Sequence, residues 1–180
     1  MQILGIAGSL RSDSVNAKLL QLAADTLPDG IDFAVWEGLR DVPPFDADTE
    51  ETPSVAVAGL RSAVAAADAV LIATPEYNGS VPGTLKNALD WGSRPGATSA
   101  FRGKPVAVIG ASPGAFGGVW AHEETRKVLG IMGARVVDAG MSLGKAPERL
   151  AEPDEELVEQ LRAVVSALVD EAAARAAAAA

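Results

Sequence analysis

A group of hydroxyl, guanidinium and amide side chains lies between residues 8 and 16. The segment reads Gly-Ser-Leu-Arg-Ser-Asp-Ser-Val-Asn, and its strongest hydrogen-bonding side chains are Ser9, Arg11, Ser14 and Asn16. Such donors, with the free backbone N–H groups of a new helix, suit an anion. The segment has neither the Gly-Lys-Ser/Thr of a Walker loop nor the spacing Gly-x-Gly-x-x-Gly. Because hydroxyls stand where those motifs have glycines, it predicts a monophosphate held by side chains.

The neighbouring patterns place this loop between a strand and a helix. Residues 3–7 form a short apolar run typical of a buried strand, and apolar residues from Val15 to Leu22 recur at helical spacing. A simpler interpretation stays open here. One of the polar residues 12–14 caps the helix, and Arg11 lies in solvent.

The composition narrows the classes of protein that fit. The chain has 180 residues and a hydrophobic fraction of 48%, which suits one domain with one core. It has no cysteine, which excludes disulfides, thiolate metal sites and thiol redox chemistry, so electron transfer needs a bound cofactor. The single histidine, His122, argues against a histidine-rich metal site, and we expect it on a solvated helix face.

The net charge and the N-terminal segment indicate which partners and which location to expect. A formal net charge of −9 argues against a nucleic acid or an anionic membrane as the main partner. No basic segment precedes the first apolar run, and no stretch approaches the about 18 apolar residues of a membrane span. We therefore expect a cytoplasmic protein with no membrane partner.

Strand-like and helix-like patterns alternate along the chain, which predicts an α/β fold with parallel strands. The first, third and fourth strands are continuously apolar, as strands covered on both faces are. The second and fifth carry Asp32, Arg135 and Asp138, which suits sheet edges. The order 2-1-3-4-5 follows, a flavodoxin-like three-layer sandwich with its binding crevice between strands one and three. The predicted strands span residues 3–7, 31–35, 69–73, 106–109 and 134–138.

The other segments complete one predicted domain, residues 1–172. The acids of residues 46–51 indicate a solvated surface loop, and helices are expected over 119–129 and from about Pro153. The Ala-rich tail, residues 173–180, has high helix propensity but no large side chain to bury. We expect this tail to fray.

Two further loops leave the same edge of the predicted sheet. Residues 74–83 combine turn formers with the only tyrosine, Tyr77. Alone, Tyr77 is typical of a loop anchor, whereas beside an anion site the loop would present backbone N–H and C=O groups to a flat heterocycle. Residues 110–118 contain glycines that allow close approach to such a ring. Glycine clusters are also common at strand ends, so this third loop is weak evidence alone.

The three loops together resemble those of the NAD(P)H-dependent FMN reductases, a group that includes flavodoxin-like quinone, chromate and azo-dye reductases. The first pattern is Gly-Ser-x-Arg-x-x-Ser-x-Asn, from Gly8 to Asn16. The longer and more specific pattern is Thr-Pro-Glu-Tyr-Asn-Gly-Ser-x-Pro-Gly-x-Leu-Lys-Asn-Ala-x-Asp-Trp, from Thr74 to Trp91. With the loop 112–118, the resemblance covers roughly residues 1–140.

The resemblance implies an FMN site built from all three loops. The FMN phosphate would be held by Ser9, Arg11, Ser14 and Asn16. The isoalloxazine ring would lie along Pro75, Glu76, Tyr77, Asn78 and Gly79. Its other side would be closed by Ser112, Gly114, Gly117 and Gly118. No side chain is assigned to catalysis, because the FMN carries the hydride chemistry.

The resemblance also implies a reaction, in which hydride passes from NAD(P)H through FMN to a quinone, free flavin, azo compound or similar small-molecule acceptor. Two alternatives stay open. One is a flavodoxin-type FMN electron carrier without NAD(P)H activity, although the Thr/Ser-x-Thr-Gly phosphate loop usual in carriers is absent. The other is a nucleotide-binding regulatory domain that has lost its flavin.

Assembly and nucleotide preference are less constrained by the sequence. In the family the helix after the tyrosine loop contributes to a dimer interface, which implies a homodimer or homotetramer. The residues expected to serve packing and assembly are Lys86, Asn87, Asp90 and Trp91. The preference for NADPH over NADH is open: Arg94 or Arg102 binds the extra phosphate, or both are ordinary surface arginines.

Overall fold

The sheet has the predicted order. The computed structural model describes residues 1–179, and its five parallel strands are arranged β2-β1-β3-β4-β5. The strands are β1 (Gln2–Ala7), β2 (Asp32–Val35), β3 (Ala69–Thr74), β4 (Pro105–Ala111) and β5 (Arg135–Leu143). The α-helices are α1 (Val15–Ala24), α2 (Val55–Ala66), α3 (Gly83–Gly92), α4 (Val119–Ile131), α5 (Ala146–Arg149) and α6 (Glu155–Ala179). Short 3-10 helices are η1 (Gly38–Asp41), η2 (Ala47–Thr49) and η3 (Gly96–Thr98).

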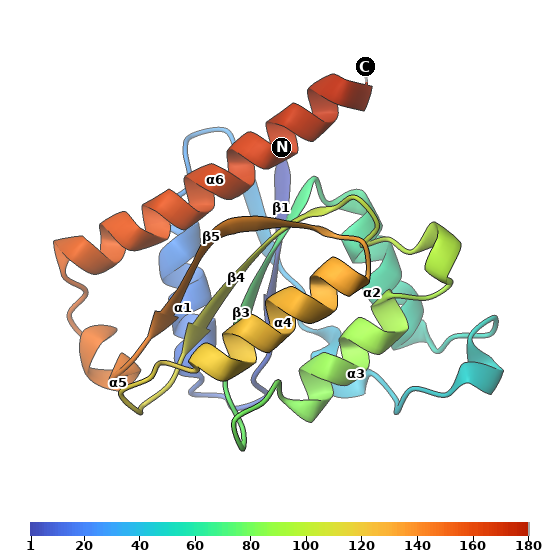
Figure 1. Ribbon diagram of the computed structural model, residues 1–180, viewed down its shortest axis with the longest axis horizontal. Coiled ribbons are helices and arrows are strands. Elements are labelled where there is room, and N and C mark those ends of the chain that lie inside the picture. The colour runs from blue at the N-terminus through green and yellow to red at the C-terminus, as the bar shows by residue number, and fades with distance from the viewer. Residues whose placement is uncertain (180) are drawn as a thin grey trace.

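Helices cover both faces of the sheet (Figure 1). On one face α1 and α6 pack through side chains such as Leu19 and Leu161. On the other, α2, α3 and α4 pack through Leu60, Leu89 and Leu129. Fully burying one leucine contributes about 1.5–3 kcal/mol. These two apolar layers therefore stabilise the sheet whose carboxyl edge carries the three loops.

β5 is longer than the strand predicted at residues 134–138. It continues to Leu143, which pairs with Ala111 at the carboxyl end of β4. Its second half contains Gly140 and Ser142, whose types are uncommon in strands, and pairing with β4 overrides that preference. The extension carries the chain to the edge where the three loops lie, and it is followed there by α5, which the sequence did not predict.

The prediction that His122 lies on a solvated helix face is wrong. Its side chain is buried between α4 and the sheet, and Nε2 lies 3.0 Å from the carbonyl oxygen of Val108. Because a carbonyl only accepts, Nε2 carries the proton and donates it. Gly140 provides the space, since a Cβ at that position would lie 2.7 Å from Nε2. His122 is therefore a structural link between α4 and β4.

The helix α4 also bonds to β5, where the pairing of β4 and β5 is irregular. In the pairing of the two strands, Val106 of β4 lies opposite Val136 of β5, and the next matched pair is Val108 with Gly140. Between them β5 holds two more residues than β4, which is a bulge. Arg126, one turn after His122, donates from Nη1 to the carbonyl oxygen of Val137 at 2.7 Å. The two side chains thus supply donors to both strands at the bulge.

Burial of His122 makes stability depend on pH. Burial lowers the pKa of His122 below its ordinary value of 6.5. The unfolded chain then binds a proton at a higher pH than the folded protein, so stability falls as the pH drops below that value. We expect His122→Gln, whose amide can still donate to Val108, to lose less stability than the wild type between about pH 7.5 and about pH 5.5. Urea unfolding at both pH values measures this, and equal losses in the two proteins would contradict it.

The Ala-rich tail is helical within the described residues, and its fraying stays a prediction. α6 continues through residues 173–179, and Ala172 is buried. Alanine has the highest helix propensity, and the tail extends a helix that is already nucleated and packed, so each added residue costs little. Residue 180 of the predicted tail lies outside the described range.

The helix α6 is long enough to span a membrane, but it is not apolar enough to do so. Its 25 residues include acids and bases such as Glu159 and Arg162, which pair on its surface. No helix among residues 1–179 combines the length and the apolar character that crossing a membrane requires.

Candidate functional site

A cleft of about 310 Å³ opens at the carboxyl edge of the sheet. Loops that follow β1, β3 and β4 form its walls, at the predicted switch point between β1 and β3. The predicted site residues in its lining are Ser9, Arg11, Ser14, Asn16, Pro75, Glu76, Tyr77 and Ser112. Those outside this lining are Asn78, Gly79, Gly114, Gly117 and Gly118. The structure thus brings together most of the set predicted from the sequence.

The start of α1 supplies free donors at one end of the cleft. Ser14 is the N-cap, and its Oγ accepts the backbone N–H of Ala17 at 3.2 Å. The hydroxyl keeps its own proton, so it can still donate to an anion. The backbone N–H groups of Val15 and Asn16 have no acceptor within residues 1–179, as expected for the first turn of a helix. Helix capping and anion binding are therefore compatible at this loop.

Arg11 is the free positive charge beside these donors. It is exposed, it lines the cleft, and it forms no ion pair with another residue in the described part of the chain. Lys18 also lines the cleft, but its Nζ is paired with Asp13. The hydrogen bond from Lys18 lowers the pKa of Asp13. Arg11 is therefore the cation of this end of the cleft that is available to pair with an anion.

Asn16 has a different role from the one predicted for its side chain. Its side chain is buried, its Nδ2 donates to the carbonyl oxygen of Ala111 at 2.9 Å, and its Oδ1 accepts the Ala111 N–H at 3.0 Å. This pair of bonds ties α1 to the end of β4. The donor that Asn16 offers to an anion is its backbone N–H.

The loop that bears Tyr77 is a small hairpin. Tyr77 and Ser80 exchange two backbone hydrogen bonds of 3.2 Å each. Asn78 and Gly79 form the tip, with φ values of 54° and 71°, the left-handed backbone that an Asn-Gly turn adopts. Tyr77 is 48% exposed at the wall of the cleft. The two tip residues shape the turn and lie outside the lining.

Glu76, at the base of the hairpin, caps the first turn of α4. Its Oε2 accepts the backbone N–H groups of Trp120 and Ala121 at 3.0 and 3.1 Å. The helix needs this cap because its own N-cap residue, Gly118, has no side chain to accept them. A carboxylate at this position also interacts favourably with the helix dipole.

Glu124, one turn into α4, binds the hairpin in return. Its Oε2 accepts the hydroxyl of Ser80 at 2.6 Å and the backbone N–H of Val81 at 3.1 Å. These two bonds lower the pKa of Glu124. We call the reciprocal contacts of Glu76 and Glu124 the glutamate clamp. It fixes the hairpin, and therefore Tyr77, relative to the loop that precedes α4.

Gly117, in the loop after β4, serves backbone packing. Its φ is +67°, and a Cβ there would lie 2.6 Å from the carbonyl carbon of Ser142 and 2.7 Å from the nitrogen of Gly144. The loop is therefore pressed against the end of β5. Ser112 and Pro113, at the start of this loop, line the cleft.

Comparison with known proteins agrees with this geometry. The sequence profile of the family described as NADPH-dependent FMN reductase matches residues 1–148. The chain belongs to this family. A quinone reductase of Pseudomonas putida is 43% identical over 125 residues, which are 69% of this chain and 67% of the relative. An NAD(P)H-dependent FMN reductase of Pseudomonas aeruginosa is 43% identical over 130 residues, 72% of this chain and 69% of the relative.

A solved structure agrees over nearly the whole length of this family member. The flavoenzyme NAD(P)H:(acceptor) oxidoreductase FerB of Paracoccus denitrificans is 32% identical. The match has a TM-score of 0.86 and covers 95% of this chain and 96% of that one. The resemblance inferred from the three loops is thus confirmed at the level of family and fold.

Part of the cleft lining in this FMN reductase family member comes from the segment after β5, from which no site residue was predicted: Pro147, Leu150 and Ala151. They belong to α5 and the residue pair that follows it. The available signal was the apolar Met141 and Leu143, which extend the fifth strand to the edge of the cleft. Because the predicted fifth strand ended at residue 138, the prediction did not bring the segment after β5 to the cleft.

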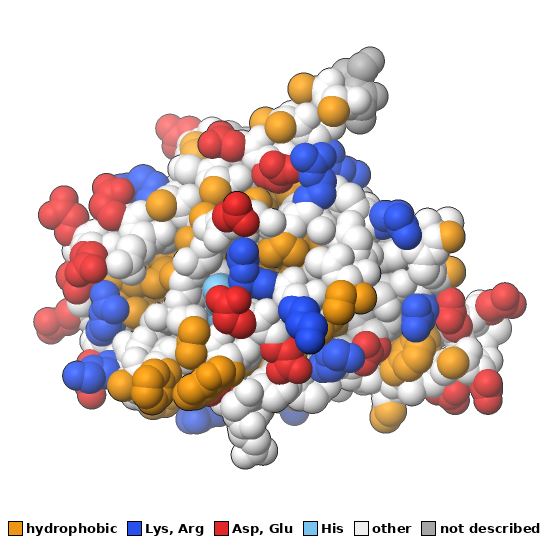
Figure 2. Space-filling view, in the orientation of Figure 1, with side chains coloured by type: hydrophobic (Ala, Val, Ile, Leu, Met, Phe, Trp, Pro, Cys, Tyr) orange, Lys and Arg blue, Asp and Glu red, His pale blue; other side chains and the backbone are white. Residues whose placement is uncertain are grey.

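The surface beside the cleft is aromatic. Phe116 and Trp120 are 68% and 54% exposed, and their ring centroids lie 5.3 Å apart. Figure 2 shows hydrophobic side chains gathered along the lower edge of the molecule, over the loop that precedes α4. Because the glutamate clamp caps α4 at Trp120, this apolar rim lies next to the hairpin.

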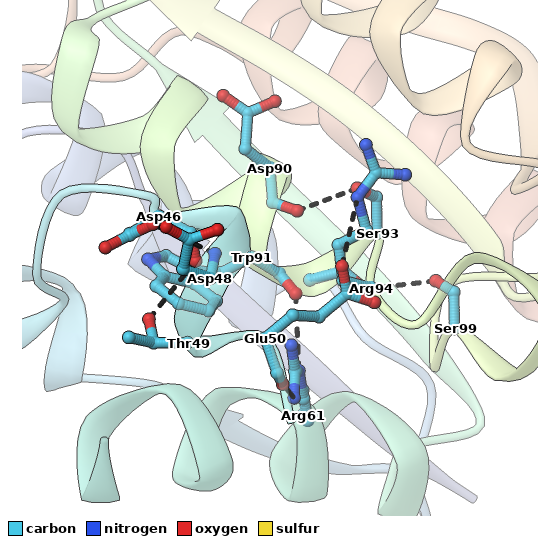
Figure 3. A network of polar contacts seen from close by, with 11 residues as sticks. Asp46, Asp48, Thr49, Glu50, Arg61, Asp90, Trp91, Ser93, Arg94 and Ser99 are labelled. Atoms are coloured by element: carbon cyan, nitrogen blue, oxygen red, sulfur yellow. Dashed lines mark hydrogen bonds and ion pairs between the residues drawn. The ribbon is translucent and has the colours of Figure 1, made fainter. Parts of the chain in front are cut away.

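Arg94 and Arg102 lie at the opposite end of the sheet from the cleft, which favours the second of the two alternatives, that both are ordinary surface arginines. Arg94 follows α3 and Arg102 precedes β4, so both are at the amino edge, where they line a separate hollow. Figure 3 shows Arg94 beside Glu50, with Arg61 bonded to the carbonyl of Trp91.

Two of the residues expected to serve packing do so. Asn87 accepts the N–H of Phe45 at 2.7 Å, and both Asn87 and Trp91 donate to the carbonyl oxygen of Pro43 at 2.8 Å. Lys86 pairs with Asp90 at 2.7 Å on the surface of α3. These contacts attach residues 42–45 to α3.

The donor set of the cleft fits FMN. Arg11, the Ser9 and Ser14 hydroxyls and the free N–H groups of α1 are the donors that a dianionic phosphate requires. Pro75, Tyr77 and Leu150 provide apolar surface farther along the same cleft.

Proposed function

We propose that this chain is an FMN-dependent oxidoreductase that passes hydride from NAD(P)H to a small-molecule acceptor such as a quinone. One observation carries the proposal: free anion donors at the start of α1 share a cleft with the hairpin that bears Tyr77. When bound, FMN supplies the chemistry, because its ring takes up and releases hydride. A nucleophile or metal ligand from the chain is not needed.

The residues of the chain bind and orient in this proposal. Arg11 and the nearby hydroxyls hold the phosphate by charge-assisted hydrogen bonds. The backbone N–H groups of Tyr77, Ser80 and Val81 already have acceptors, so the hairpin offers those of Glu76, Asn78 and Gly79 to negative charge. Glu76 acts as a positioning residue, because its carboxylate is committed to the start of α4.

An anaerobic absorption spectrum of the purified protein tests this function. We expect a yellow flavoprotein, or one that becomes yellow with added FMN, and we expect the colour to bleach when NADPH or NADH is added. A flavodoxin-type carrier would bind FMN and stay yellow without a partner reductase. A colourless protein that ignores FMN would contradict the proposal and favour a regulatory domain.

Assembly and location belong to the same proposal. We infer a homodimer or homotetramer located in the cytoplasm, with a quinone, free flavin or azo compound as acceptor. Light scattering coupled to size-exclusion chromatography measures the assembly. A mass equal to one chain of 18.4 kDa would contradict this part and leave the FMN site unaffected.

A further inference from the structure

A second cavity, of about 390 Å³, lies on the other side of the loop between β1 and α1. Its walls are residues 9–12 of that loop and the segment that follows β2. Ser9 and Arg11 line both this cavity and the cleft. The two spaces are therefore neighbours, and one extended ligand could occupy parts of both.

The segment after β2 brings a base, an acid and an aromatic ring to this cavity. Arg40 lines it and donates from Nη2 to the carbonyl oxygen of Leu10 at 2.7 Å, which attaches η1 to the phosphate loop. Its other guanidinium N–H groups have no acceptor within residues 1–179. Glu37 and Trp36 line the cavity as well. Neither Arg40 nor Glu37 forms an ion pair with another described residue.

This arrangement has the chemistry of a site for an adenosine ribose. In Rossmann folds, which share parallel strands and crossover helices with this chain but carry a Gly-x-Gly-x-x-Gly loop, the ribose of the adenosine is recognised near the end of the second strand. A carboxylate there accepts the 2′-hydroxyl of NADH, and an arginine there binds the 2′-phosphate of NADPH. Here β2 ends at Val35, and Glu37 and Arg40 follow it directly.

We propose that this cavity receives the adenosine ribose of the nicotinamide nucleotide, and that Arg40 and Glu37 together set the preference between NADPH and NADH. Arg40 attracts the 2′-phosphate, whereas Glu37 repels it and accepts the 2′-hydroxyl. The proposal rests on the proposed function, since it concerns the nucleotide that reduces the flavin. It also replaces Arg94 and Arg102 as the candidates for binding the extra phosphate.

Steady-state kinetics with both nucleotides test the proposal. Arg40→Gln removes the charge but keeps an amide that can donate to Leu10, so we expect the KM for NADPH to rise about 10- to 100-fold. The KM for NADH should change less than about twofold. Glu37→Gln should have the opposite sign, lowering the KM for NADPH severalfold. Arg102→Gln, at the far end of the sheet, is the matched control and should change neither.

A binding measurement gives a readout that does not need turnover. Adenosine 2′,5′-bisphosphate and adenosine 5′-monophosphate are titrated into the FMN-loaded protein by calorimetry. We expect the bisphosphate to bind more tightly, and Arg40→Gln to remove most of that difference. The circular dichroism spectrum and the FMN content of Arg40→Gln should match those of the wild type, which excludes a folding defect in the variant.

The outcomes separate this inference from the proposed function. If Arg40→Gln weakens both nucleotides equally, or leaves the bisphosphate titration unchanged, the inference is wrong while flavin reduction stands. If neither nucleotide bleaches the flavin, the proposed function fails, and the titration still shows whether the cavity recognises a 2′-phosphate.

Discussion

Replacing Gly117 by alanine is expected to destabilise the protein by about 2–5 kcal/mol. The new Cβ would lie 2.6 Å from the carbonyl carbon of Ser142, and the backbone has a φ of +67°. The contact is with the backbone of β5, which pairs with β4 and cannot move independently of the sheet. Both the overlap and the left-handed conformation therefore contribute. Because typical domains are stable by about 5–15 kcal/mol, the loss is a large part of the total.

Gly59→Ala is the matched control for this prediction. Gly59 lies in the interior of α2, and nothing lies within 4 Å of a Cβ built there. An alanine at such a position should stabilise the helix by about 0.5–1 kcal/mol. Urea unfolding of both variants measures the two free energies. A Gly117→Ala protein as stable as the wild type would show that the loop does not press against β5 in solution.

Arg11→Ala should weaken FMN binding about 10- to 100-fold. Arg11 is the unpaired cation at the end of the cleft where α1 offers its free N–H groups. Removing it takes away charge-assisted bonds to the phosphate and leaves the hairpin and the ring site intact. The rate of flavin reduction in FMN-saturated enzyme should therefore stay within about twofold of the wild type.

A titration followed by flavin fluorescence measures this affinity. Arg11→Lys keeps the charge but loses the planar fork, so it should fall between the wild type and Arg11→Ala. Arg102→Ala, at the amino edge of the sheet, should bind FMN as the wild type does. Wild-type affinity in Arg11→Ala would contradict the assignment of the phosphate end of the cleft.

The topology and the position of the cleft could be predicted from the sequence because both depend on local patterns. Apolar runs identified β1, β3 and β4 as central strands, and the charged residues Asp32 and Arg135 marked the edges. The loops at the carboxyl ends of β1, β3 and β4 then had to lie together.

Features that depend on the packing of distant segments were not predictable in this way. The burial of His122 depends on Gly140, eighteen positions later, leaving room for the imidazole. The length of β5 depends on a bulge that only pairing with β4 reveals. Glu76 and Glu124 are acidic residues of ordinary appearance, and their contacts appear only when the hairpin and α4 are placed side by side.

The glutamate clamp and the phosphate site should respond differently to a change in ionic strength. Each carboxylate of the clamp bonds to neutral groups, three backbone N–H groups and one hydroxyl in all. Counterions screen an exposed guanidinium and a phosphate over about 10 Å at 0.1 M salt and about 3 Å at 1 M. Concentrated salt should therefore release FMN while the hairpin keeps its position. Dialysis against concentrated salt thus offers a way to obtain an apoprotein with an ordered site.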